Sequence, residues 1–184
     1  AEIGPIWRQA LWLAVIVGVL LFAFMRWSPQ LLVLMQIDES IRLPASEFLY
    51  AISWGAPGLA LFFASRYLSE GLSWTQPTLV FGVVALILLV PVGYVLLFGY
   101  GPIPEMGAAG LGYATALIMW LEFLAFAWYL YKSKHFADLG LLSRWDWPKF
   151  SAIKQLLFLG IPMGIAIFME GSLFVATALF IGQL

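Results

Sequence analysis

The sequence contains no cysteine and only one histidine among its 184 residues. The lack of cysteine excludes disulfides, thiolate metal sites and a cysteine nucleophile. Charged residues are also scarce, at 10% of the chain, whereas a soluble domain carries about 25%. The net charge of −1 excludes the basic face that nucleic-acid-binding proteins need, so we expect no nucleic-acid partner.

Apolar residues dominate what remains. They make up 63% of the chain, and the mean hydropathy is +0.96. Because no polar surface is left to coat a soluble fold, the lipid bilayer must be the solvent for much of the chain. The apolar runs predict five transmembrane helices: roughly 9–35, 46–67, 76–99, 107–131 and 152–184. They are too long for barrel strands, so we expect an all-α, polytopic helical bundle.

The ends of the chain indicate a fragment of a longer membrane protein. The sequence starts without a methionine and stops inside an apolar run. The longest and most polar connection, 132–151, predicts a linker between two bundles. Residues 1–131 would then be part of an N-terminal bundle, and 152–184 would be the first helix of a C-terminal bundle.

The distribution of lysine and arginine predicts the orientation. Seven fall on the side of the N-terminus and the 132–151 loop: Arg8, Arg66, Lys132, Lys134, Arg144, Lys149 and Lys154. Only Arg26 and Arg42 fall on the other side. We therefore expect a multi-pass protein of the inner (plasma) membrane, with the N-terminus of the fragment and the 132–151 loop cytoplasmic.

Glu170 is the one charged residue in the apolar run 155–184. A carboxylate at the centre of a span costs roughly 2.5–3.5 kcal/mol, and keeping it neutral at pH 7 costs about 3.7 kcal/mol. Because these costs are close, binding of a proton, a Na⁺ ion or a cationic substrate can decide whether Glu170 is charged or neutralised. On a helix, Met163, Phe174 and Thr177 lie within about 60° of it. We predict that this face binds cation and substrate; a structural hydrogen bond between helices is the alternative.

Other features of the spans point to packing and bending. The opposite stripe of the last span carries small residues that allow close helix approach: Gly160, Gly164 and Gly171. Pro162, Pro91 and Pro57 are hinge candidates, with ordinary kinks as the alternative. Glu122 is a second intramembrane acid. It either faces a cavity and binds cation or substrate, or lies near the cytoplasmic end and reaches outward.

No serine–histidine or metal constellation can be assembled, so we expect no enzyme activity and no metal site other than a Na⁺ ion at Glu170. Three segments carry a more specific signal: SRYLSEGLSWTQPTL, YVLLFGYGPIPEMGAAGLGYATALIMW and LFLGIPMGIAIFMEGSLFVATALFIGQL. Together they resemble the multidrug and toxic compound extrusion (MATE) family, in its bacterial NorM-like branch. The first is similar to the loop after the family's fourth helix and the second to its fifth-to-sixth-helix connection. The third is similar to the start of the family's second half, with the family glutamate at Glu170.

The resemblance implies helices three to seven of about twelve, in two bundles that rock against each other. Such proteins exchange Na⁺ or H⁺ for cationic, often aromatic drugs, and need no cofactor beyond the coupling ion. Many members carry Asn-x-Pro-x-Asn-Tyr in the fifth helix, where this chain reads LVPVGY at 89–94. Pro91 and Tyr94 match that pattern, and both amides are absent.

We therefore expect a secondary active efflux transporter that exports cationic, lipophilic drugs in exchange for Na⁺ or H⁺ by alternating access. Its partners would be the lipid bilayer, small organic cations and the remaining helices of the same full-length chain. One alternative is a lipid-linked oligosaccharide flippase of the same superfamily. Flippases line their cavity with several basic residues, and we expect no lysine or arginine deep in these spans. The other is a scaffold subunit without transport, in which Glu170→Gln changes stability but not flux.

Overall fold

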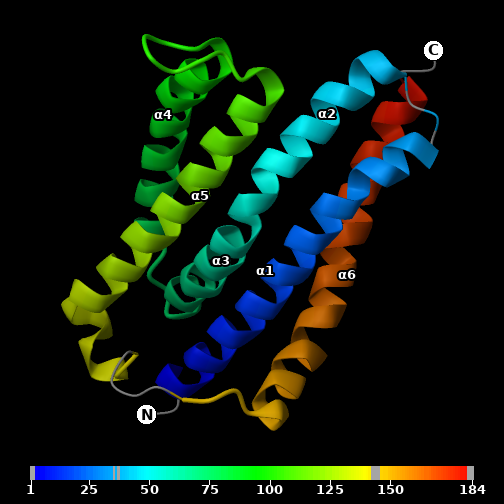
Figure 1. Cartoon of the computed structure of the whole chain (residues 1–184). Helices are drawn as coiled ribbons and strands as arrows, with labels where there is room; N and C mark the ends of the chain where they lie inside the picture. The colour runs from blue at the N-terminus through cyan, green and yellow to red at the C-terminus, as the bar shows by residue number, and fades with distance from the viewer. Residues whose placement is uncertain (1–2, 35, 37, 142–145, 182–184) are drawn as a thin grey trace. The chain divides into compact units, whose positions relative to one another are not determined.

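The structure, a computed structural model, describes residues 3–34, 36, 38–141 and 146–181, with all side chains there except those of 137–139, 174–176 and 178–181. These residues are helical almost throughout (Figure 1). The elements are α1 (Ile3–Leu34), α2 (Glu39–Ile52), η1 (Ser53–Gly55), α3 (Ala56–Gly71), α4 (Gln76–Phe98), α5 (Gly107–Lys132), η2 (Lys134–Leu139) and α6 (Phe150–Ile181). Five helical stretches are long and apolar enough to cross a membrane, with α2 to α3 forming one of them. The predicted fold class is confirmed.

The chain divides into two compact units, Ala1–Asp146 and Trp147–Leu184. In the first unit, α5 packs against α2, α3 and α4, while α1 packs against α2 and α3. The stretch from α2 to α3 therefore lies between α1 and α5, and α4 lies on α5 (Figure 1). The described part of the second unit contains a single helix, α6.

Small residues let the helices of the first unit approach closely. A Cβ atom built on Gly18 of α1 would lie 2.7 Å from the Cα of Pro57, and one built on Gly112 of α5 would lie 2.6 Å from the Cβ of Ala51. Between membrane helices, close packing at small residues replaces the hydrophobic effect as the driving force. The glycines of α1 and α5 therefore fix how these helices meet the stretch from α2 to α3.

The second predicted span differs from the prediction. It begins earlier than residue 46, at Glu39, where Asp38 caps the helix by accepting a hydrogen bond from the Ser40 backbone N–H at 2.9 Å. It is also interrupted at η1. Pro57 has no N–H to donate to the Ser53 carbonyl, so the helix tightens and the Ala56 N–H bonds to that carbonyl instead.

The segment after α5 folds back onto the start of α1. Arg8 makes an ion pair with Asp146 at 2.6 Å and donates from Nη1 to the carbonyls of Gly140 and Leu141, at 2.9 and 3.0 Å. Beside it, an apolar cluster joins α1, α3, α5 and this segment: Trp7, Phe62, Phe126, Leu130, Phe136 and Leu141. Part of the predicted linker thus belongs to the packed core of the first unit.

Candidate functional site

Glu170 lies on α6, in a helix whose described side chains are largely exposed. It is exposed itself, and no hydrogen bond or ion pair to it occurs among the residues that the structure describes. An apolar helix that crosses a bilayer leaves such a carboxylate without water, so its charge needs a cation or a proton. Among the described residues, the Glu170 carboxylate therefore has no partner for its charge.

The residues predicted to share its face lie on the same helix. Met163 is 65% exposed, and the Thr177 hydroxyl donates to the Leu173 carbonyl at 2.8 Å, which leaves the oxygen lone pairs of Thr177 available as acceptors. The side chain of Phe174 lies outside the described part of the structure. The shared face of these four residues stays a prediction.

The other predicted features of α6 have no neighbours in the described chain. Pro162 lies inside the helix, which continues past it. A Cβ atom built on Gly160, Gly164 or Gly171 would meet nothing within 4 Å. Close approach of another helix along this glycine stripe, and a hinge at Pro162, therefore stay predictions.

Glu122 lies on α5 in the first unit, half-buried at the wall of a cavity of about 220 Å³ between α4 and α5. The rest of the wall is apolar: Phe81, Val84, Ala85, Leu88, Ile118, Leu121 and Ala125. Arg66 of α3 lies close enough for its charge to act on Glu122. An acid in an apolar cavity, with one cation nearby, can hold an organic cation or a proton.

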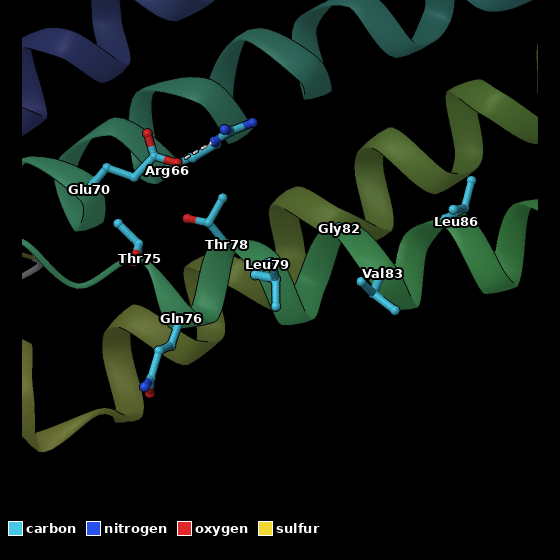
Figure 2. A pocket seen from close by; sticks show the side chains of 9 residues that line it. All are labelled: Arg66, Glu70, Thr75, Gln76, Thr78, Leu79, Gly82, Val83 and Leu86. Carbon is cyan, nitrogen blue, oxygen red and sulfur yellow. Dashed lines mark hydrogen bonds and ion pairs between the residues drawn. The ribbon is translucent and has the colours of Figure 1, made fainter.

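A second cavity of about 620 Å³ lies between α3 and the start of α4 (Figure 2). Arg66 and Glu70 form an ion pair of 2.7 Å on its α3 side. Figure 2 shows Thr78 reaching from α4 toward that pair, and its buried hydroxyl has no hydrogen-bond partner in the described chain. The rest of the α4 side carries the polar Gln76 and the apolar Leu79, Val83 and Leu86.

The sequence reasoning did not connect Glu122 with Arg66 and Glu70, which lie on different helices. The i,i+4 spacing of Arg66 and Glu70 is a signal that predicts their ion pair. No sequence pattern places Glu122 near that pair, since α3 and α5 meet only through tertiary packing.

The remaining hinge candidates differ in their surroundings. Pro57 lies at the start of α3, directly after the interruption at η1. Pro91 lies inside α4, which stays helical on both sides of it. Pro57 thus accompanies a real change of helix type, whereas at Pro91 the structure has an uninterrupted helix. Both remain candidates for movement.

The expectation about deep basic residues was wrong. Arg26 of α1 donates from Nε to the Ser53 hydroxyl at 3.1 Å, and Ser53 lies close to the middle of the apolar stretch Glu39–Gly71. The guanidinium therefore reaches far into the span. The described residues include no group of three or more histidine, cysteine, aspartate or glutamate side chains that could hold a metal ion.

The chain is similar to known membrane proteins. The family described as MatE matches residues 1–95. A probable multidrug resistance protein NorM of Xanthomonas campestris pv. campestris is 48% identical over 183 residues, covering 100% of this chain and 40% of that protein. The multidrug resistance protein PmpM of Pseudomonas aeruginosa is 39% identical over 182 residues, covering 98% and 38%. The chain thus spans about two fifths of the length of these curated relatives.

Proposed function

The chain belongs to the MatE family, and on that premise we propose that it forms part of a transporter that exports lipophilic cations in exchange for Na⁺ or H⁺. The observation that carries the proposal is Glu170, an intramembrane carboxylate with no partner among the described residues. The names of the similar proteins, which refer to multidrug resistance, support an efflux activity.

Competition at one carboxylate would couple the two fluxes. Glu170 carries a single negative charge, so an organic cation, a Na⁺ ion and a proton each neutralise it and exclude the others. Such exclusion is reciprocal: the coupling ion lowers the affinity for the drug by the same factor by which the drug lowers the affinity for the ion. Drug release on one side of the membrane then follows from ion binding.

The neighbours of Glu170 on α6 would shape the substrate class. Phe174 offers a ring face for a cation, and Met163 offers a flexible thioether that adapts to different apolar bodies. The Thr177 oxygen, whose proton is donated to Leu173, accepts from an ammonium group or coordinates Na⁺. These groups suit aromatic cations better than sugars or amino acids.

Glu122 would provide a second cation site in the first unit. It lines an apolar cavity between α4 and α5, and the charge of Arg66 acts on it. A cation entering this cavity would be drawn to Glu122 and would compete with Arg66 for it. We propose that Glu122 attracts substrate, while Glu170 couples substrate to the ion.

Alternating access requires helices that bend at defined points. The interruption at η1 is one such point, because Pro57 removes a backbone hydrogen bond in the middle of the stretch from α2 to α3. Pro91 and Pro162 remove one bond each within α4 and α6. We propose that these three prolines act as hinges when the two bundles rock.

We propose that the start of α1 and the segment after α5 lie on the cytoplasmic side of the inner membrane, because lysine and arginine are concentrated there. In this orientation the turn between α4 and α5 faces the periplasm. Substrate would enter from the cytoplasmic side or from the inner leaflet and leave on the opposite side.

Efflux of ethidium from cells that express the full-length protein tests this function. Glu170→Gln removes the charge and keeps the shape, so efflux should fall to the level of cells without the transporter. Glu105→Gln is the matched control, because Glu105 is exposed in the turn between α4 and α5, and its efflux should equal that of the wild type. Equal efflux in both variants contradicts the coupling role. A scaffold subunit without transport predicts no ethidium efflux even in the wild type.

A further inference from the structure

The cavity between α3 and α4 begins at one end of two membrane spans. Because α3 ends at Gly71 and α4 begins at Gln76, the short turn between them marks a membrane face. The residues that line the cavity run from this turn to Leu86 of α4 (Figure 2). Leu86 is ten residues after Gln76, or about 15 Å along the helix. Since the hydrocarbon core is about 30 Å thick, the cavity extends over the depth of about one leaflet.

The α4 side of the cavity changes from polar to apolar along this depth. Six of its residues follow the three- and four-residue spacing of one helix face: Thr75, Thr78, Leu79, Gly82, Val83 and Leu86. The two threonines lie nearest the membrane face, and the exposed Leu79, Val83 and Leu86 form an apolar stripe further in. A Cβ atom built on Gly82 would meet nothing within 4 Å, so this glycine leaves room between the side chains of the stripe. A molecule with a polar head and an apolar chain matches this face.

The polar end of the cavity holds an ion pair with unused hydrogen-bonding groups. Arg66 donates from Nε to Glu70 Oε1 at 2.7 Å, and both side chains are partly exposed. Within the described ranges this is the only hydrogen bond that either side chain makes. The two terminal nitrogens of Arg66 therefore have no acceptor, and the second oxygen of Glu70 has no donor. The pair can bind an anionic group and a cationic group at the same time.

The Thr78 hydroxyl is a third unused group beside this pair (Figure 2). A threonine inside a helix often donates to the carbonyl four residues earlier. For Thr78 this is the carbonyl of Trp74, which accepts from the Ser69 hydroxyl at 2.6 Å. The buried Thr78 hydroxyl has no partner in the part of the chain that the structure describes. Because an unpaired buried hydroxyl is unfavourable, an acceptor that reaches it would be stabilised.

We propose that this cavity binds a phospholipid whose headgroup carries a primary ammonium, as in phosphatidylethanolamine. The phosphate would accept from the terminal nitrogens of Arg66 and from the Thr78 hydroxyl, while the ammonium would donate to Glu70. One acyl chain would lie along the apolar stripe. The start of α4 favours the phosphate at its end of the cavity, because the N-terminus of a helix carries partial positive charge. This inference goes beyond the export function and does not depend on it.

The pairing of charges distinguishes this headgroup from other common ones. Phosphatidylglycerol brings an anion for Arg66 but no cation for Glu70. Phosphatidylcholine brings both charges, but its trimethylammonium has no N–H to donate to the Glu70 carboxylate. We therefore expect phosphatidylethanolamine to bind most tightly of the three.

Native mass spectrometry of the purified full-length protein tests the site, by titration with the three lipids carrying identical palmitoyl and oleoyl chains. In the wild type, the Kd for phosphatidylethanolamine should be at least about tenfold below that for phosphatidylcholine, as expected for hydrogen bonds to a charged group. This comparison needs no variant. Equal Kd values for these two lipids overturn the proposal, and this is also the result expected if other helices of the full-length chain fill the cavity.

Glu70→Gln should change the order of the lipids. Arg66 then keeps its charge without an acid beside it, so phosphatidylglycerol should bind more tightly than phosphatidylethanolamine, and the preference over phosphatidylcholine should disappear. Equal losses for all three lipids in Glu70→Gln overturn the proposal, because they show a structural role. Thr78→Val removes the hydroxyl and nearly keeps the shape. It should raise all three Kd values several-fold without changing their order, and unchanged values contradict the proposed position of the phosphate.

The matched control is Glu39→Gln, which makes the same change in another ion pair within a helix. Glu39 pairs with Arg42 at 3.4 Å and begins the stretch Glu39–Gly71, whereas Glu70 lies at its other end. Glu39→Gln should keep the wild-type order of the lipids. A control that also loses the preference for phosphatidylethanolamine assigns it to the overall charge and overturns the site. Because the titration does not involve export, a protein without ethidium efflux contradicts the proposed function and leaves this test unaffected.

Discussion

Replacing Gly112 with alanine tests the packing on which the first unit depends. Gly112 lies on the face of α5 that meets α2, and it has no room for a side chain. A Cβ atom there would lie 2.6 Å from the Ala51 Cβ, 2.8 Å from the Phe48 carbonyl oxygen and 3.0 Å from the Ile52 nitrogen. Two of these three atoms belong to the backbone, so a rotamer change cannot relieve the overlap.

The geometry gives the size of the effect. Ordinary van der Waals contact begins at 3.4 Å, so the Ala51 contact is short by about 0.8 Å and α2 must move away from α5. Overpacking of this kind costs about 1–3 kcal/mol. The matched control is Gly82→Ala on α4, where a Cβ atom would meet nothing within 4 Å. There alanine should be neutral or stabilise by up to about 1 kcal/mol through its helix propensity.

The assay is thermal unfolding of the purified full-length protein, followed by the loss of the monodisperse peak in size-exclusion chromatography. Gly112→Ala should melt below the wild type, and Gly82→Ala at or above it. Adding Ala51→Gly to Gly112→Ala removes the shortest contact but not those with the α2 backbone, so it should restore part of the loss. Equal melting temperatures for the two single variants would refute the close approach of α2 and α5.

Three further predictions concern separate parts of the chain. Arg8→Met should lower the stability by about 3 kcal/mol and expose the segment after α5 to protease, because Asp146 is left without its partner; unchanged proteolysis contradicts this. Glu122→Gln should raise the KM for ethidium transport several-fold with little change in the maximal rate. If the maximal rate falls by as large a factor as the KM rises, Glu122 does not act mainly by attracting the substrate. Hydrogen bonds from the Ser40 side chain and backbone hold the pKa of Asp38 below its ordinary value. The Asp38 carboxylate therefore stabilises the helix start at neutral pH, and this stabilisation is lost as the pH falls through the lowered pKa. The difference in melting temperature between the wild type and Asp38→Ala should therefore shrink below about pH 4, and a difference that grows in acid contradicts the cap.

The helices could be predicted because a membrane span needs only an apolar run of sufficient length. The start of α2 was missed because the prediction followed the charge-free run and not the helix-start signal at Asp38. Pro57 was recognised as a candidate hinge, but the extent of the interruption depends on which carbonyl loses its donor, and only the structure shows this.

Contacts between helices could not be predicted. Arg26 was counted at the outer end of its span because sequence gives the position of its Cα but not the direction of its side chain. The inward direction of the Arg26 side chain follows from helix geometry and from its contacts with the rings of Tyr50 and Trp54, which lie in the stretch from α2 to α3. Arg8 and Asp146 are 138 residues apart, and no pattern in the sequence connects them. Glu170 was found because an isolated carboxylate in an apolar run is visible in the sequence itself.

Displacement of bound ethidium from the purified full-length protein tests the central claim most directly. Competition at Glu170 predicts that adding Na⁺ or lowering the pH raises the Kd for ethidium by about tenfold or more in the wild type, within the usual range of coupling free energies. In Glu170→Gln, the Kd should not depend on the ion that displaces ethidium from the wild type. A variant that binds ethidium and still releases it to that ion as readily as the wild type contradicts the claim that Glu170 couples the two fluxes.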